Sequence, residues 1–361
     1  MHVDRFLLRT WALLGLLACC HAWVAGAESV RAEPARNASA AESLALYDGA
    51  DRQQRLLEVA KKEGELTLYT VTPASNADPV IAAFTKKYGI KVNLWRASSE
   101  VVLKRIVTEA QGGRFDVDVT ENNTLENEAL HREQLLQAVQ SPYAKDLMPQ
   151  AGAPHREWVG TVINIWIAAY NTRLIKEQEL PHSYDDLLDA KWKGRLGIEA
   201  SNYAWFATVT QALGAEQALK LFGKLVATNG LSVRKGHSLL AGLVASGEIP
   251  LALTVYNWNV PVLDKKGAPI KGHMLAPLVG QFRTVALHKK SPHPNAGLLF
   301  YDFMLNEGQQ ILADLGEVVP SKNIDSPYTR QSIAFVDPGQ ALDKGGQWQR
   351  TWDDVVLKRA R

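Results

Sequence analysis

The chain has few cysteines, no long apolar stretch in its body and little net charge, and each shortage excludes a class of protein. Of its 361 residues only two are cysteines, Cys19 and Cys20, and they lie together near the N-terminus. Disulfide frameworks, thiolate nucleophiles and cysteine-based zinc sites are therefore not expected in the rest of the chain. The 40 basic residues nearly balance the 38 acidic ones and form no basic cluster, which argues against a nucleic-acid partner.

The first 27 residues have the pattern of a secretion signal. Arg5 and Arg9 precede and border an apolar run, Trp11–Cys20, which small residues follow up to Ala25–Ala27. No later segment reaches the ~20 apolar residues that a membrane-spanning helix needs. We expect cleavage after residue 27 and export to the periplasm. Lipid anchoring at Cys19 is a minor alternative, because residues 16–19 loosely resemble a lipoprotein motif.

Residues 28–50 are rich in alanine, glutamate and serine and lack periodic apolar positions, so we expect a tether. The remaining chain is long enough for two domains at the usual ~150 residues each. Its apolar periodicity predicts alternating strands and helices, the pattern of parallel βαβ units. The expected strands are 66–71, 90–95, 115–120, 162–170, 195–198 and 249–255, and the expected helices begin at Asp78, Ser98 and Ser183 or span 203–213 and 215–227.

Motifs for covalent, metal or nucleotide chemistry are missing from the sequence. It contains no H-E-x-x-H, no phosphate-binding P-loop and no G-x-G-x-x-G, and Gly236–Leu240 lacks the final glycine of a nucleophile elbow. We therefore expect no catalytic residue, metal ligand or cofactor, and a function in binding rather than in catalysis.

Short polar segments follow the expected strands, where ligands bind in open α/β sheets. Each could equally cap the next helix, since serine, threonine, asparagine and aspartate are the usual capping residues. Their recurrence at equivalent places in two units favours a ligand site. The candidates are Thr72, Ser75, Ser98, Ser99, Glu121, Asn122, Ser201, Asn202 and Tyr203.

Three further segments carry a family resemblance: Ser183–Gly194, Ala245–Pro250, and Ser291–Ala296 leading into Glu307–Gln309. With them, residues 55 to 325 resemble the type 2 periplasmic solute-binding proteins of ABC importers, in their ferric-ion-binding branch. The resemblance implies a two-lobed α/β fold, with mixed sheets flanked by helices and a hinge of two crossing strands near residues 160–165 and 269–275. Lobe 1 would comprise 51–160 plus 271–315, and lobe 2 would comprise 161–270 plus 316–361.

The resemblance also implies a function: capture of a small molecule or ion between the lobes, and its delivery to an ABC permease in the inner membrane. We expect a monomer. The same pocket would serve the sensing partner of a membrane kinase, and a periplasmic enzyme on this fold is a third alternative.

Ferric-binding members typically use a histidine after the first strand, a glutamate after the third, and two adjacent tyrosines. In this chain Glu121 falls at the glutamate position, but Pro73 stands in place of the histidine. Asn257 and Trp258 replace the tyrosine pair, and Tyr256 lies one residue early. Ferric iron, free or with an anion, is therefore the alternative ligand.

A small anionic solute is the leading hypothesis for the ligand. Positions that contact a bound anion in the family are occupied by Asn122, Ser201 and His237, and histidine can donate a hydrogen bond to an oxyanion. Arg283 could bind a carboxylate or phosphate with two hydrogen bonds, or form a salt bridge at the rim. Tyr256 could stack on an organic ligand or pack against the hinge.

Overall fold

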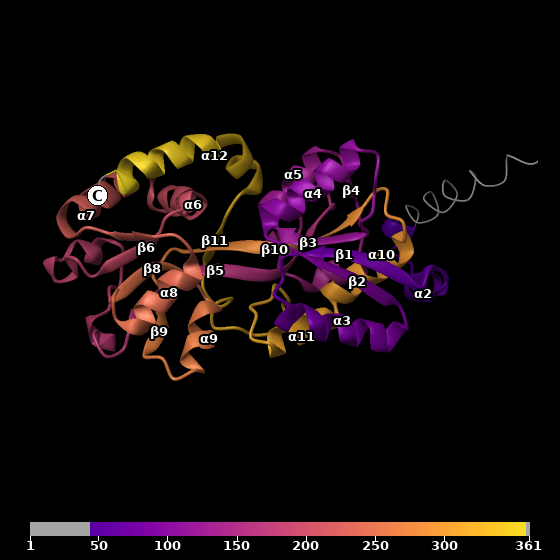
Figure 1. The fold of residues 1–361 in the computed structure, drawn as a ribbon, viewed down its shortest axis with the longest axis horizontal. Coiled ribbons are helices and arrows are strands. Elements are labelled where there is room, and N and C mark those ends of the chain that lie inside the picture. Colours follow the sequence, from indigo (N-terminus) through magenta and orange to yellow (C-terminus); the bar gives the residue numbers. More distant parts are fainter. Residues whose placement is uncertain (1–43, 359–361) are drawn as a thin grey trace, which may run out of the picture. The chain divides into compact units, whose positions relative to one another are not determined.

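One mixed β-sheet runs through residues 44–358, the part of the chain that the computed structural model describes (Figure 1). Along the sheet the strand order is β2-β1-β3-β10-β5-β8-β6-β7, with β4 and β11 paired to β10 and β9 paired to β5. The strands are β1 (Glu65–Thr70), β2 (Lys91–Arg96), β3 (Val119–Asn123), β4 (Leu136–Gln137), β5 (Val159–Asn171), β6 (Leu196–Glu199), β7 (Ser232–Arg234), β8 (Leu251–Tyr256), β9 (Ile270–His273), β10 (Leu278–His288) and β11 (Ile333–Phe335).

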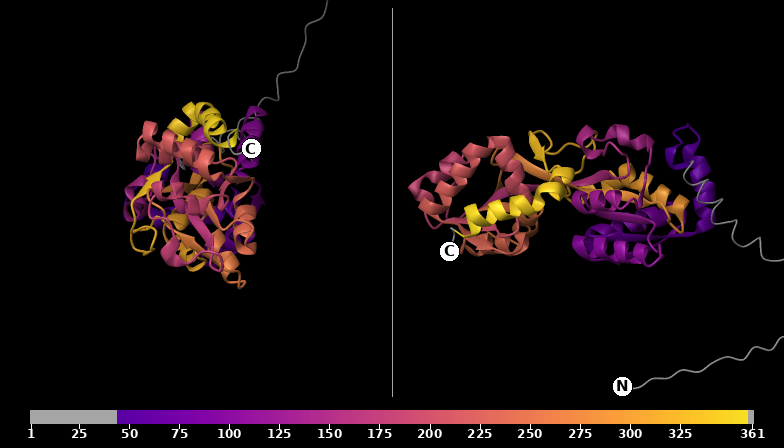
Figure 2. Two further views of the ribbon diagram at one scale, coloured as in Figure 1. Left: turned by 90° about the vertical axis from the view of Figure 1, so that its left-hand side faces the viewer. Right: turned by 90° about the horizontal axis from the view of Figure 1, so that it is seen from above.

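Helices cover the sheet on both sides of the central strands (Figures 1 and 2). Many of them end at glycines with positive φ, such as Gly64 at 74° and Gly89 at 73°, because the left-handed conformation lets the chain turn back into a strand. The helices are α2 (Arg52–Glu63), α3 (Ala74–Tyr88), α4 (Ser99–Gln111), α5 (Thr124–Arg132), α6 (Tyr203–Leu213), α7 (Ala215–Asn229), α8 (His237–Ser246), α9 (Asn259–Asp264), α10 (Pro294–Leu305), α11 (Glu307–Asp314) and α12 (Pro338–Trp352).

Two long antiparallel strands, β5 and β10, lie at the centre of the sheet. They connect a first group of strands, β1, β2 and β3, with a second group, β6, β7 and β8. All 13 residues of β5 are buried, as expected of a strand covered on both faces. Its first half pairs with β10, and its second half pairs with β8 and β9. We predicted the second crossing strand at 269–275, but residues 270–273 form β9, which pairs with β5 alone. The long strand beside β5 is β10, and it begins only at Leu278.

The second group of strands has an aromatic core. The Phe222 ring packs against Trp205 and Phe206, with ring centroids 5.7 and 5.3 Å apart. Trp352 at the end of α12 packs 5.2 Å from the Phe206 ring and donates from Nε1 to Ala200 O at 2.7 Å. These contacts attach α12 to α6, while its other end reaches α5 through an ion pair between Asp343 and Arg132.

Three sequence-based element boundaries were wrong. Helix α3 begins at Ala74, four residues before Asp78, so Pro79 lies inside it and leaves the carbonyl of Ser75 without its helical N–H partner. Strand β3 begins at Val119 rather than at residue 115, which places Glu121 within the strand. The helix expected from Ser183 is a short 3-10 turn, Asp185–Leu188.

The expected secretion signal, residues 1–27, and most of the expected tether lie outside the described residues. The last part of the tether, residues 44–50, packs against the fold. Ala45 is fully buried and its carbonyl accepts from Gln140 N at 2.8 Å, while the Arg52 guanidinium donates to Tyr47 O. This short stretch therefore packs against α2 and the segment that follows β4.

Candidate functional site

A cavity of about 500 Å³ lies where the ends of β1, β2, β3 and β8 meet the central strands. Its volume is within the range of small-molecule sites. Asn164 of β5 and Gln281 and Arg283 of β10 contribute from the central strands. The other lining residues are Val71, Pro73, Ser75, Asn76, Arg96, Asn123, Tyr256, Trp258, Pro261, Val262, Lys265, Leu315, Gly316 and Glu317.

A buried network of charges forms one side of this cavity. Glu121 Oε1 lies 3.2 Å from Arg283 Nε, and Arg283 Nη2 lies 3.2 Å from Glu317 Oε1. The hydroxyls of Thr70 and Thr72 donate to Glu121 Oε2 at 2.7 and 2.5 Å. Burial disfavours the Arg283 cation, but the two carboxylates outweigh it and raise its pKa. Both oxygens of Glu121 are therefore occupied by groups of the protein.

Strand register explains this network. Thr70 of β1 lies directly opposite Glu121 of β3, and Arg283 of β10 lies opposite Asn123, two residues further along β3. Residues two apart on a strand share a face, so Glu121 and Arg283 meet on the same side of the sheet. Two groups separated by 162 positions in sequence become an ion pair in this way.

A group of aromatic side chains, which we call the aromatic wall, forms another side of the cavity. The rings of Tyr256 and Trp258 lie nearly parallel with centroids 6.0 Å apart, and Trp166 packs 5.3 Å from Tyr256. Gln281 Nε2 donates to the Tyr256 hydroxyl at 3.1 Å. Burial, followed by nearby carboxylates, raises the pKa of Tyr256, so the phenol is protonated at neutral pH. This wall can stack on a ligand and donate one hydrogen bond to it.

Cations outnumber carboxylates among the lining residues. Arg96 and Lys265 are both exposed and both line the cavity, and Arg96 Nε donates to Thr72 O at 2.9 Å. The carboxylate among the lining residues, Glu317, accepts from Arg283 and from Asn76 Nδ2 at 2.8 Å. The cavity therefore offers positive charge, amide groups and an aromatic surface to a bound molecule.

The sequence profile of bacterial extracellular solute-binding proteins matches residues 80–326. The chain belongs to this family. It is 26% identical over 267 residues to iron uptake protein A1 of Synechocystis, covering 69% of this chain and 73% of that protein.

Among solved structures, this solute-binding protein resembles iron-bound HitA from Pseudomonas aeruginosa, with a TM-score of 0.67 and 23% identity over 79% of this chain and 98% of the other. It also resembles AfuA from Actinobacillus pleuropneumoniae with bound fructose-6-phosphate, with a TM-score of 0.66 and 22% identity over 82% and 99%. These similarities confirm the predicted two-lobed α/β fold. No helix within residues 44–358 is long and apolar enough to cross a membrane.

Three of the predicted site residues line the cavity of this solute-binding protein: Ser75, Tyr256 and Arg283. Thr72 and Glu121 lie directly behind Arg283 in the buried network. Tyr256 lies one residue before positions 257 and 258, where ferric-binding members would have their tyrosine pair. It is the last residue of β8 and its side chain lines the cavity, so a ligand can reach it.

Four further predicted residues, Ser98, Ser99, Asn122 and Asn257, do not line the cavity. Asn257 Oδ1 accepts from Ile165 N at 2.9 Å and so fixes β5. Asn122 Nδ2 donates to Ser99 O at 3.1 Å, which joins β3 to the start of α4. Ser98 is exposed at the N-cap of α4 and makes no capping hydrogen bond with its side chain.

In the second group of strands, a carboxylate of the protein stands where we expected an anionic ligand. Glu199 is 4% exposed and accepts from Ser201 N at 2.6 Å and from Gly236 N at 3.0 Å, at the starts of α6 and α8. His237 Nδ1 contacts Thr254 O at 3.0 Å, and burial lowers its pKa. These donors are already occupied. The predicted Ser201, Asn202, Tyr203 and His237 do not line the cavity, although the His237 ring lies 4.2 Å from Tyr256.

Sequence reasoning missed eight polar or aromatic lining residues. Arg96 and Asn123 end β2 and β3, so the rule that ligands bind at strand ends should have selected them in place of Ser98 and Asn122. Lys265 lies directly after α9 and had no comparable signal. Asn76 lies in the first turn of α3, and the others come from the central strands and from loops: Asn164, Trp258, Gln281 and Glu317.

Glu126, in the first turn of α5, is a further residue that the sequence did not single out. Its Oε2 atom is buried and has no hydrogen-bond partner among residues 44–358, and burial raises its pKa to about 7. Burial raises the pKa of Tyr203 and of Tyr256, and the Glu126 carboxylate adds to both shifts; at Tyr256 it follows Glu199. At neutral pH this buried carboxyl group is therefore partly protonated.

Proposed function

We propose that this protein is the periplasmic receptor of an ABC importer, and that it captures a small solute carrying an anionic group in the cavity between β1, β2, β8 and the central strands. It would act as a monomer without catalysis and hand the solute to a permease in the inner membrane. Family membership supports the receptor role. The charge of the lining supports the choice of ligand, because Arg96, Arg283 and Lys265 oppose only the paired Glu121 and Glu317.

The aromatic wall supports an organic anion. Tyr256 and Trp258 present ring faces, while Asn76, Asn123 and Asn164 supply amides that can bind hydroxyl groups. A sugar phosphate would use both kinds of surface, with its phosphate at Arg96 and Lys265 and its ring against the aromatic side chains. AfuA, of similar fold, holds fructose-6-phosphate.

Titration calorimetry with fructose-6-phosphate, inorganic phosphate and citrate tests this assignment. We expect Arg96→Ala and Lys265→Ala each to weaken binding about tenfold, which corresponds to ~1.4 kcal/mol. Lys224→Ala is the matched control, because this exposed lysine lies on α7 away from the cavity. Native mass spectrometry of the purified protein should show a bound anion. A neutral or cationic molecule in its place would remove the proposal.

Ferric iron held together with an anion is the second candidate, supported by the name of the Synechocystis relative and by the iron-bound HitA structure. The tyrosine that lines the cavity, Tyr256, has a raised pKa, and Glu121 is engaged by Arg283 and two threonines. This donor set disfavours iron. A visible absorption band with ferric citrate that disappears in Tyr256→Phe would establish iron instead.

A further inference from the structure

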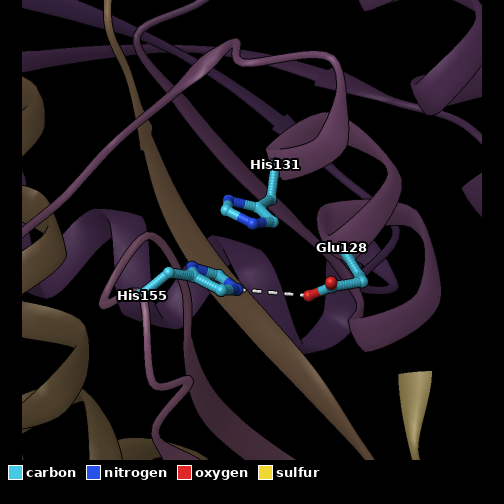
Figure 3. A group of neighbouring side chains, drawn as sticks. All are labelled: Glu128, His131 and His155. Atoms are coloured by element: carbon cyan, nitrogen blue, oxygen red, sulfur yellow. Dashed lines mark hydrogen bonds and ion pairs between the residues drawn. The ribbon is translucent and has the colours of Figure 1, made fainter. Parts of the chain in front are cut away.

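A second cluster of potential ligands lies outside the cavity, between α5 and the segment that leads into β5. Glu128 and His131 project from one face of α5, three residues apart, and His155 approaches them from residues 153–158 (Figure 3). One ligand atom from each lies within 4.8 Å of the others. His155 Nε2 is 3.2 Å from Glu128 Oε2, and the two imidazole rings stack with centroids 3.6 Å apart.

The backbone before β5 is held in an unusual conformation that directs His155 and Glu157 to this face. Arg156 has φ of 58°, a left-handed conformation that residues other than glycine rarely adopt. Its N–H donates to Ala153 O at 3.0 Å, and its carbonyl accepts from Val139 N at 2.8 Å. With Arg156 turned in this way, the residues on either side of it both contact side chains of α5.

Supporting groups orient two of the three ligands. Glu157 Oε2 lies 2.8 Å from His131 Nδ1, so that nitrogen carries the proton and Nε2 is left as a free electron-pair donor. Trp158 Nε1 donates to Glu128 Oε2 at 3.1 Å. A carboxylate behind a ligating histidine and a donor behind a ligating carboxylate are the usual outer partners at metal sites.

We propose that Glu128, His131 and His155 bind a zinc ion, with water as the fourth ligand. Two imidazole nitrogens and one carboxylate oxygen suit Zn²⁺, and not Ca²⁺ or Mg²⁺, which prefer oxygen ligands alone. Tetrahedral zinc with bonds of ~2.0–2.1 Å needs ligand atoms about 3.3 Å apart. The ligand atoms lie within 4.8 Å of one another and the two imidazole rings are stacked at 6°, so binding requires the side chains to rotate until their free electron pairs converge on the ion.

One adjustment accompanies binding. His155 Nε2 now faces Glu128, while its Nδ1 accepts a hydrogen bond from Glu157 N at 3.2 Å. Coordination through Nε2 moves the ring proton to Nδ1, which ends this long backbone contact. The zinc then joins α5 to the segment before the central strand β5. None of the three ligands lines the solute cavity, so the site is independent of the proposed transport function.

Zinc chloride titrated into the tag-free mature protein, followed by calorimetry, tests the site. We expect one zinc ion per chain, and at least tenfold weaker binding in His131→Ala and His155→Ala. Glu128→Gln should also weaken binding, and its amide oxygen can still accept from Trp158. His182→Ala is the matched control, because His182 is exposed and lies outside the cluster.

Cobalt supplies a readout that a general loss of structure would not imitate. Co²⁺ bound by the wild type should give the visible absorption bands of a four-coordinate site, and these bands should disappear in Glu128→Gln while the far-ultraviolet circular dichroism stays unchanged. Zinc should also raise the thermal midpoint of the wild type but not of His131→Ala. Equal zinc affinity in the wild type and His131→Ala, or a spectrum typical of six-coordinate cobalt, would overturn the proposal.

Discussion

The two groups of strands each bury one glutamate, Glu121 within β3 and Glu199 at the end of β6, and they satisfy its charge by different means. Glu121 in β3 is held by the Arg283 cation and by the hydroxyls of Thr70 and Thr72. Glu199 in β6 is held by the backbone N–H groups of Ser201 and Gly236. Glu121 is neutralised by a cation from a strand that is distant in sequence, whereas Glu199 is held by backbone N–H groups at two helix starts.

This difference separates ligand contacts from internal contacts. Where an arginine neutralises the glutamate, the cavity beside it keeps its remaining cations for a ligand. Where a glutamate occupies the helix starts, their N–H groups are no longer free, although their local sequence resembles an anion site. A polar loop in sequence is therefore weaker support for binding than an unneutralised cation in the structure.

Removing the Arg283 cation should have the largest effect on the free energy of unfolding. Arg283→Met leaves Glu121 and Glu317 buried without their partner, which destabilises the fold by about 3 to 5 kcal/mol. Urea unfolding followed by circular dichroism measures this, with Arg96→Met as an exposed control in the same cavity. Adding Glu121→Gln to Arg283→Met should recover part of the loss. No recovery would show that shape, and not charge, explains the effect.

Removing Glu199, the buried glutamate of the second group of strands, should lower the free energy of unfolding by a smaller amount. Glu199→Ala frees two N–H donors that water can reach, and we expect a loss of about 1 to 3 kcal/mol. Acetate should then raise the thermal midpoint of this variant more than sodium chloride of equal concentration does, because the anion replaces the missing carboxylate. Equal stabilisation of the wild type by acetate would contradict this explanation.

Glu126 provides a test that depends on pH. Its pKa is raised from 4.5 to about 7 in the folded protein, so the folded state holds the proton more tightly than the unfolded state. The contribution of Glu126 to the free energy of unfolding is therefore fully present below pH 4.5, and it is lost as the pH rises through about 7. Glu126→Gln should therefore be about 1 to 2 kcal/mol more stable than the wild type at pH 8, and equally stable at pH 4. Urea unfolding at both pH values checks the sign.

Ser201→Ala should have the smallest effect. The side chain of Ser201 is exposed, and the hydrogen bond to Glu199 comes from the backbone N–H, which the substitution keeps. We expect a change in unfolding free energy within about 0.5 kcal/mol, and unchanged affinity for the anions tested above. A tenfold loss of affinity would instead show that the ligand binds beside Ser201, in the second group of strands.

Most strands and helices followed from local pattern, but their limits did not always do so. The apolar spacing that predicted β1, α4, α6 and α7 is a property of neighbouring residues. The start of α3 was missed because Asp78-Pro79 resembles a helix start, although the chain is already helical from Ala74. The helix-start signal at Asp78-Pro79 competes here with packing, because Ala77 and Val80, on either side of this pair, are both buried by the fold.

The candidate site was predicted only in part, for a geometric reason. Of the predicted ligand-binding residues, Tyr256, Arg283 and Ser75 line the cavity: Tyr256 ends β8, Arg283 lies on the central strand β10, and Ser75 lies in the first turn of α3. Lys265 and Glu317 carried no signal, since each approaches the cavity from a loop whose path depends on tertiary packing. The histidine cluster was invisible for the same reason, because His155 lies 24 positions after His131 and meets it only through the turn at Arg156.

Local periodicity and the family segments were enough to establish the α/β fold and the solute-binding class, because both depend on residues close together in the chain. Which polar groups remain free for a ligand was decided by strand register, which sets Arg283 beside Glu121, and by the close approach of the α6 and α8 starts, which encloses Glu199. Such pairings depend on the distances between groups far apart in sequence, and only the folded chain fixes those distances.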